Sequence, residues 1–416
     1  MIKLRSLNSG IRIIMEEIPY VQSVAVGIWV KAGAVDENDF NSGISHFIEH
    51  MVFKGTTHRN SRQIAEDIDK IGGQINAFTG KEATCYYVKS LYNNFEKGTD
   101  VLIDMLSDSL FDIEEIEKER KVICEEIKMT LDDPDELAHD TITELVFKNS
   151  DLGRSIIGTP KSLNNISRDV MKDYYYNEYS RDNIVISIAG KFDEEQVCSY
   201  LEDKLMQLKD NKNRKESIIG EYKPSYKVIE KDIEQSHICL GTKGLKLGDD
   251  RYYAFSILNN IMGGSMSSRL FQNIREEKGL AYSVYSMANS FSHDGYFNIY
   301  AGVSHDKINN AVNGIKEELI QLEKKGVTLD ELNMAKEQLK GHYIFGQESV
   351  AGRMFSIGKS MILQGVVYTP EQVIKGIDSV TLDDINRVKK LICDIDNYSA
   401  VAVTNNRIKL EEMLKG

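Results

Sequence analysis

Two stretches far apart in the chain resemble each other: SLNNISRDVMKDYYYNEYSRDNIVISIAG at residues 162–190 and GIDSVTLDDINRVKKLICDIDNYSAVAVT at residues 376–404. Both place a Ser or Thr cap and an acidic residue before a helical pattern, which is followed by an Asn and an apolar strand. Residues 111–128 and 327–345 form a second pair of amphipathic helices that open with acidic residues. The two halves of the chain are therefore predicted to be divergent copies of one domain.

Strand-like runs lie between these helices, at residues 23–33, 83–91, 184–190, 281–290 and 296–304. They do not alternate regularly with helices, as the strands of a parallel βαβ fold would. The pattern predicts the α+β class, with two similar domains that each contain a mostly antiparallel sheet packed with helices.

A polar stretch at residues 207–226 is the least core-like part of the chain and contains Gly220 and Pro224 near its end. A chain of 416 residues is longer than one hydrophobic core usually supports. We therefore expect a zinc-bearing domain at residues 1–206, a linker at 207–226 and a second domain at 227–416.

Composition narrows the classes of partner and the compartment. The formal charge of −13 argues against a general nucleic-acid binder, which needs clustered Lys and Arg, and favours cationic partners. The chain has no apolar run of membrane-spanning length and does not begin with a basic head and an apolar core, so we expect neither a membrane protein nor an exported one. Five scattered cysteines without a CxxC pair predict reduced thiols in the cytoplasm.

The segment SGISHFIEHMVFKGT at residues 42–56 carries two histidines four residues apart. On a helix this spacing places the imidazoles of His46 and His50 one above the other, where both can bind one metal ion. Glu49 lies beside them and can take a proton from a metal-bound water without binding the metal. The alternative is that two of the eight histidines fell at helical spacing by chance and are ordinary polar groups.

A third ligand is expected because a catalytic zinc ion usually has three protein ligands and an open position for water. In the helix at residues 119–131, Glu126 falls within an apolar stripe marked by Val122, Ile123, Ile127 and Thr130. A carboxylate in such a stripe must be paired or bound to a metal. Glu119 lies on the same face and suits a supporting role, unless it is a solvated charge at the helix end, and Glu125 is the weaker candidate for the third ligand.

Taken together, HFIEHMVFKGT, the Glu126 found 76 positions after His50, and ERKVICEEI resemble the pitrilysin family of inverzincin zinc metallopeptidases, particularly its processing-peptidase branch. The resemblance implies that His46, His50 and Glu126 bind one zinc ion per chain, that Glu49 is the general base and that Glu119 assists it. It extends over nearly the whole chain, including residues 72–87, 151–160 and 267–286.

The substrate is expected to be a peptide in an extended conformation. Gly72 and Gly73 end a helix, and the next residues predict a hairpin whose exposed edge can add a peptide strand through main-chain hydrogen bonds. The resemblance assigns this role to the strand that contains Asn76, Ala77 and Phe78. It also places Phe53 beside the scissile bond, although core packing explains Phe53 equally well.

In the second half, Arg275 and Tyr282 match an Arg and Tyr pair that the resemblance implies holds the substrate carbonyl and stabilises the oxyanion. Without the resemblance both would be interpreted as structural. The stretch SILNNIMGGS, which corresponds to the metal motif, lacks His and acidic residues, so this domain is expected to be inactive. Family members of this length work in pairs, and we therefore expect a homodimer or a partnered subunit.

These features predict a zinc metalloendopeptidase that cleaves unstructured peptides or presequence-like segments by attack of a zinc-bound hydroxide. The alternative is a non-catalytic assembly or peptide-binding subunit of a processing complex, because the family includes relatives that have lost the metal site. A zinc ion that only braces the structure would need a fourth protein ligand.

Overall fold

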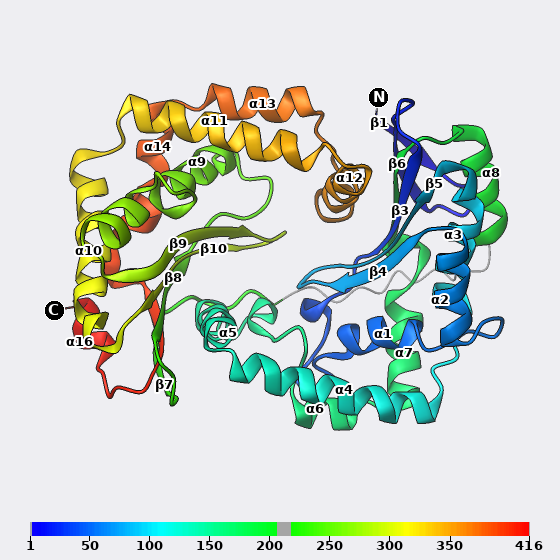
Figure 1. Cartoon of the computed structure of the whole chain (residues 1–416), viewed down its shortest axis with the longest axis horizontal. Coiled ribbons are helices and arrows are strands. Elements are labelled where there is room, and N and C mark those ends of the chain that lie inside the picture. Colours follow the sequence, from blue (N-terminus) through cyan, green and yellow to red (C-terminus); the bar gives the residue numbers. More distant parts are fainter. Residues whose placement is uncertain (1, 206–217, 416) are drawn as a thin grey trace. The chain divides into compact units, whose positions relative to one another are not determined.

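The structure is a computed structural model that describes residues 2–205 and 218–415. Its contacts divide the chain into two compact units (Figure 1). Unit 1 contains the described residues within 1–127, 154–217 and 344–369, and unit 2 contains those within 128–153, 218–343 and 370–416. Residues 207–217 of the predicted linker lie outside the described residues, so a division at that linker stays a prediction.

Unit 1 is built around a six-stranded sheet with the order β1-β2-β6-β3-β5-β4. All neighbouring pairs are antiparallel except β2 and β6, which are parallel. β4 lies at the edge, and among the described strands it pairs only with β5. The strands are β1 (Ile2–Ser6), β2 (Arg12–Glu17), β3 (Ser23–Val30), β4 (Gln74–Thr79), β5 (Thr84–Leu91) and β6 (Ile184–Gly190).

Both faces of this sheet are buried, as alternate side chains along β3 show. Val26 and Ile28 point into the main core, which also contains residues of the helices on that face. Trp29 points to the opposite face, where it packs in a second cluster with Ile357 of α12 (Val350–Gln364). Trp29 Nε1 donates a hydrogen bond of 2.9 Å to Ser187 Oγ in β6. A helix from the second half of the sequence therefore covers the sheet of unit 1.

Unit 1 contains seven further described α-helices, of which α4 extends a few residues into unit 2. They are α1 (Ile44–Val52), α2 (Ser61–Lys70), α3 (Phe95–Ser107), α4 (Ile113–Asp132), α6 (Pro160–Asn165), α7 (Arg168–Glu178) and α8 (Glu194–Leu205).

Unit 2 has a five-stranded sheet with the order β7-β11-β8-β10-β9, in which only β7 and β11 pair in parallel. One face packs into an apolar core and the other is covered by α5, whose Ile142 and Val146 lie against Gly241 of β8. The strands are β7 (Tyr226–Glu230), β8 (Ser236–Lys243), β9 (Ala281–Ser290), β10 (Gly295–Val303) and β11 (Ser399–Thr404). The helices are α5 (Pro134–Val146), α9 (Tyr252–Gly263), α10 (Ile308–Lys325), α11 (Leu329–Gly346), α13 (Pro370–Ser379), α14 (Leu382–Val388), α15 (Lys390–Cys393) and α16 (Leu410–Lys415).

The two sheets have matching connections. β6 and β11 end the two repeated stretches, and each pairs in parallel with the first or second strand of its own unit and antiparallel with the strand that follows. Ser167 caps the helix before β6, and Thr381 caps a helix before β11. The predicted α+β class with two similar domains, each a mostly antiparallel sheet packed with helices, is confirmed.

Among the described residues, no helix combines the length and the apolar character needed to cross a bilayer. All five cysteines are free thiols.

Candidate metal centre

α1 presents the residues of the metal motif on one side. Its apolar side chains, including Phe47 and Ile48, are fully buried in the core of unit 1. The side chains of His46, Glu49 and His50 lie on the opposite, half-buried side. The spacing of four residues brings the two imidazole rings to 4.6 Å between their centres, as the sequence predicts.

A buried carboxylate holds the start of this helix. The backbone N–H groups of Gly43 and Ser45 donate hydrogen bonds of 2.7 and 2.9 Å to the two carboxylate oxygens of Glu37. Burial raises the pKa of Glu37 to about 7, although both hydrogen bonds and the charge of Arg154 act in the opposite direction. Glu37 was not singled out by the sequence, because only the folded chain places it at the first turn of α1.

α4 brings Glu126 to the two histidines. Its Oε2 atom lies 3.9 Å from His46 Nε2 and 3.7 Å from His50 Nε2. The possible ligand atoms of the three residues all lie within 4.8 Å of one another. Ile123 and Ile127 anchor this part of the helix in the core, as predicted, but the expectation that Val122 belongs to the inner stripe is wrong, because its exposed fraction is 44%.

The three side chains fit a zinc ion. Tetrahedral zinc with bonds of about 2.0–2.1 Å separates its ligand atoms by roughly 3.3 Å, close to the two distances from Glu126 to the imidazoles. Glu126 Oε2 is buried and has no hydrogen-bond partner among the described residues, which is costly for a carboxylate oxygen unless a cation compensates it. Burial, and then the neighbouring His50, lower the pKa of His46 to about 4, which keeps its imidazole in the neutral form that binds metals.

The second ring nitrogen of His50 contacts Glu119. Nδ1 of His50 lies 3.1 Å from Glu119 Oε2, and Lys54 Nζ lies 2.6 Å from Glu119 Oε1. Glu119 is only 6% exposed, so it is not the solvated charge that its sequence position also allowed. A carboxylate can only accept, so the proton of the imidazole sits on Nδ1 and the lone pair of Nε2 faces Glu126.

Glu49 is held by the strand next to it. Thr79 Oγ1 at the end of β4 donates a hydrogen bond of 2.5 Å to Glu49 Oε2. Burial raises the pKa of Glu49, while the hydrogen bonds from Thr79 lower it. Thr79 was missed at the sequence level, although the alternation of β4 indicates that it shares a face with Ala77.

The three residues of β4 that the resemblance assigns to the substrate face different ways. Ala77 packs against the main core of unit 1. Asn76 and Phe78 point to the opposite face, where the ring of Phe78 lies 5.7 Å from the rings of both Trp29 and Phe355. Only the backbone of Phe78 is therefore available on the side of α1.

The remaining predicted residues lie in different surroundings. Phe53 follows the last residue of α1 and packs, half-buried, against the core of unit 1. Arg275 and Tyr282 belong to unit 2. Arg275 lies in a π-helical turn (Phe271–Glu277) with its guanidinium 4.6 Å from the ring of Phe271, and Tyr282 is 76% exposed in the edge strand β9. Their action at the metal centre stays a prediction.

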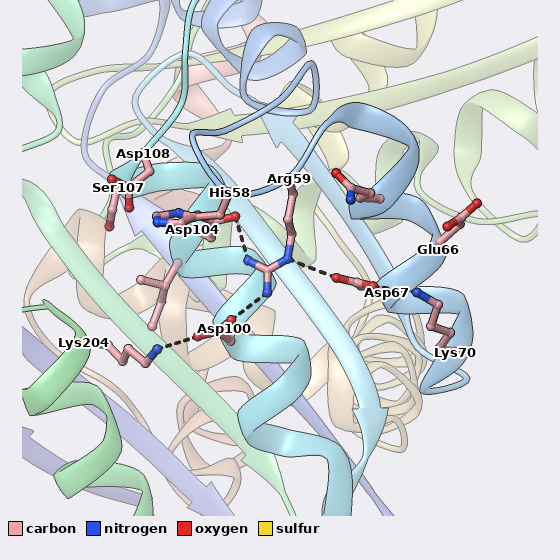
Figure 2. Close-up of a pocket in the computed structure, with 12 residues that line it drawn as sticks. His58, Arg59, Glu66, Asp67, Lys70, Asp100, Asp104, Ser107, Asp108 and Lys204 are labelled. Atoms are coloured by element: carbon pink, nitrogen blue, oxygen red, sulfur yellow. Dashed lines mark hydrogen bonds and ion pairs between the residues drawn. The ribbon is translucent and has the colours of Figure 1, made fainter.

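A second group of possible ligands lies elsewhere in unit 1. His58, Asp104 and Asp108 line a pocket of about 580 Å³ (Figure 2). Two of these three residues are already engaged in polar contacts: Arg59 binds Asp104 at 2.7 Å, and Asp104 also accepts from His58 at 2.8 Å. His58 is largely exposed. We interpret these contacts as a structural network.

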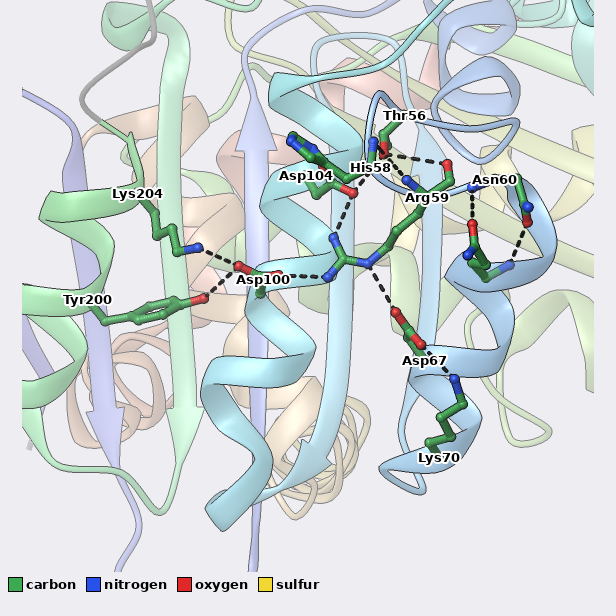
Figure 3. Close-up of polar contacts among 11 residues, drawn as sticks. Thr56, His58, Arg59, Asn60, Asp67, Lys70, Asp100, Asp104, Tyr200 and Lys204 are labelled. Carbon is green, nitrogen blue, oxygen red and sulfur yellow. Dashed lines mark hydrogen bonds and ion pairs between the residues drawn. The ribbon is translucent and has the colours of Figure 1, made fainter.

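This network fixes the loop that follows α1. Arg59 also binds Asp67 of α2 and Asp100 of α3, and Lys204 of α8 binds Asp100 from the other side (Figure 3). The guanidinium thus joins the loop to two helices through three carboxylates. The sequence does not reveal this network, because the three carboxylates that bind Arg59 are distributed over two helices, α2 and α3.

Comparison with known proteins defines the class to which this fold and cluster belong. The family described as Insulinase (Peptidase family M16) matches residues 12–160, and the Peptidase M16 inactive domain matches residues 165–339. The first range contains His46, Glu49, His50 and Glu126. The chain belongs to peptidase family M16, which confirms the predicted pitrilysin family.

Relatives in two bacteria are similar over almost their whole length. A protein of Bacillus subtilis (strain 168) named "Uncharacterized zinc protease YmxG" is 41% identical over 93% of this chain and 94% of its own. An "Uncharacterized zinc protease" of Rickettsia felis is 36% identical over 97% and 98%. Both names imply zinc and a peptidase role for those proteins.

Solved structures show the same fold. A peptidase M16 inactive domain from Pseudomonas fluorescens has a TM-score of 0.91 at 18% identity and covers 98% of this chain and 99% of its own. A protease from Helicobacter pylori has a TM-score of 0.91 at 20% identity and covers 97% and 99%. At these identities the likeness concerns the fold alone.

Proposed function

We propose that this chain is a zinc endopeptidase that cleaves unstructured peptides, with His46, His50 and Glu126 as zinc ligands. The observation that carries the proposal is the buried oxygen of Glu126, which faces two imidazole nitrogens at 3.7 and 3.9 Å and has no hydrogen-bond partner among the described residues. The group contains three ligand residues, as a catalytic site with an open position requires.

A zinc ion bound here would polarise the peptide carbonyl and make a water molecule more acidic. Glu49, half-buried beside the ligands, takes a proton from the attacking water and delivers it to the leaving amine. Thr79 holds the carboxylate in position for both transfers. Glu119 keeps the ring of His50 in the tautomer that binds metal.

The substrate class follows from β4. As the edge strand beside α1, it can pair with an extended peptide through main-chain hydrogen bonds, which do not depend on the peptide sequence. Thr79 at the end of β4 contacts Glu49, so a peptide paired with this edge would run close to the base. The net charge of −13 favours basic peptides.

The test combines zinc binding with cleavage. The purified chain, loaded with zinc, is incubated with a panel of unstructured peptides with and without a chelator, and its mass in solution is measured to test for the expected homodimer. We expect cleavage that the chelator abolishes and zinc restores. The variant Glu49→Gln should retain one zinc ion per chain and lose cleavage.

Two outcomes would contradict the proposal. Near-normal turnover by Glu49→Gln would exclude this residue as the base. Binding of peptides without cleavage by the zinc-loaded chain would favour the non-catalytic, peptide-binding alternative.

A further inference from the structure

Lys54 lies just beyond the end of α1, outside the metal motif itself. Its backbone N–H donates a hydrogen bond of 3.0 Å to Met51 O, which adds a last turn to the end of α1. From this position the side chain reaches Glu119 of α4, with Nζ 2.6 Å from Oε1. The lysine side chain is 30% exposed and the glutamate side chain 8%. The contact therefore joins the helix of the histidines to the helix of Glu126 at a largely buried point.

Glu119 has one carboxylate oxygen for each neighbour. Oε1 accepts from Lys54 and Oε2 accepts from Nδ1 of His50. Burying a carboxylate is costly unless a cation or several donors compensate it. Lys54 provides that cation, and its position also prevents Glu119 from rotating away from His50.

The orientation of His50 decides whether the metal centre is complete. Its ring must present the lone pair of Nε2 toward Glu126, which requires that Nδ1 carry the proton and that an acceptor hold it. We propose that Lys54 is a positioning residue for the metal ligand His50 and acts through Glu119. This inference rests on the proposed function, because it assumes that the three ligand residues bind zinc.

The test measures zinc affinity directly, by competition with a chelator of known affinity. Lys54→Met removes the charge and keeps a similar apolar stem, and Lys54→Arg restores a cation of similar reach. We expect Lys54→Met to bind zinc about 10- to 100-fold more weakly, as is usual when a partner of a metal ligand is lost. Lys54→Arg should stay within about threefold of the wild type, because it restores the charge–carboxylate contact.

A matched control is available on α4. Lys118 precedes Glu119 in the sequence, but its side chain is 63% exposed and pairs with Glu115. Lys118→Met also removes one lysine charge, from α4 itself and next to Glu119 in the sequence. We expect it to leave the zinc affinity unchanged. Thermal unfolding of each apo variant shows whether the fold is intact.

A double-mutant cycle separates action through Glu119 from independent damage. If Lys54 acts through Glu119, the variant with both Lys54→Met and Glu119→Gln should bind zinc no more weakly than Glu119→Gln alone. Additive losses would overturn the inference. So would a Lys54→Met chain with lowered thermal stability and unchanged zinc affinity, since that result means a purely structural ion pair.

The result for the wild-type chain distinguishes this inference from the proposed function. If the wild type binds zinc and cleaves peptides while Lys54→Met binds zinc equally well, only the role of Lys54 is lost. If the wild type binds no zinc, the proposed function fails and the role of Lys54 fails with it.

Discussion

Thr79 Oγ1 donates a 2.5 Å hydrogen bond to Glu49 Oε2, which links the last residue of the edge strand β4 to the proposed general base. The strand that we propose pairs with the substrate therefore also holds the carboxylate that we propose acts on it. Because β4 and α1 approach each other only in the folded unit, this contact ties peptide placement to base placement.

We predict that Thr79→Val, which keeps the shape of the side chain, lowers kcat about 10- to 100-fold. A hydrogen bond to a charged group contributes about 1.5–3 kcal/mol, and its loss leaves Glu49 free to rotate away from the water. Peptide cleavage kinetics and zinc content are the measurements. KM and zinc content should not change, and Thr79→Ser should retain most of the activity. A valine variant with the kcat of the wild type would show that Thr79 does not position Glu49.

Zinc affinity should depend on Glu126 and not on its neighbour. Glu126→Gln should weaken zinc binding by more than about 100-fold, because losing a partner of a ligand alone costs about 10–100-fold. Glu125→Gln removes a carboxylate from the exposed side of the same turn and should leave the affinity unchanged. Metal analysis after dialysis against a weak chelator checks both variants. Equal retention of zinc by the two would contradict the assignment.

Patterns within single helices were sufficient to select the three residues that the structure brings together as proposed zinc ligands. The spacing of His46 and His50 and the place of Glu126 among apolar residues depend only on helix geometry. Thr79 and Lys54 were not found because each lies at the end of an element, and its partner is set by how two elements approach in the folded chain. The sequence also does not predict where segments pack when their partners lie in the other half of the chain, because this too depends on how elements approach in the folded chain.

One of these segments is α12, which the predicted division at 207–226 places in the second domain but which packs on the sheet of unit 1. Periodicity predicts that such a helix is amphipathic and does not say which sheet it covers. The repeated stretches, in contrast, predicted one strand of each sheet correctly, because each repeat contains its own helix and strand.

The buried carboxyl of Glu37 predicts a pH-dependent stability. Its pKa is raised from 4.5 to about 7, so the folded chain holds this proton more tightly than the unfolded chain. The stability that results is fully present below the unfolded pKa and is lost as the pH rises through the folded pKa. At about 1.4 kcal/mol per pKa unit, the loss between pH 5 and pH 8 is roughly 2.5 kcal/mol.

Thermal unfolding of the metal-free chain at pH 5 and pH 8 measures this loss. We expect Glu37→Gln to be less stable than the wild type at pH 5, since an amide nitrogen cannot accept from Gly43 or Ser45, and to lose less stability between the two pH values. Glu114→Gln, which removes an exposed carboxylate at the start of α4, should follow the wild type. A Glu37→Gln curve parallel to that of the wild type would mean that Glu37 is ionised in both states.

The packing of α12 on unit 1 depends on a glycine. A Cβ added at Gly358 would lie 2.0 Å from Trp29 Nε1 and 2.6 Å from Ser187 Oγ, where it would break the hydrogen bond between them. Gly358→Ala should therefore destabilise unit 1 by about 1–3 kcal/mol or more, the usual cost of overpacking. Trp29 is the single tryptophan of the chain, so urea unfolding followed by its fluorescence reports on this contact. Gly346→Ala at the end of α11, where a Cβ meets no atom within 4 Å, should leave the midpoint nearly unchanged. A midpoint for Gly358→Ala equal to that of Gly346→Ala would show that α12 does not pack on the face of β3 that carries Trp29.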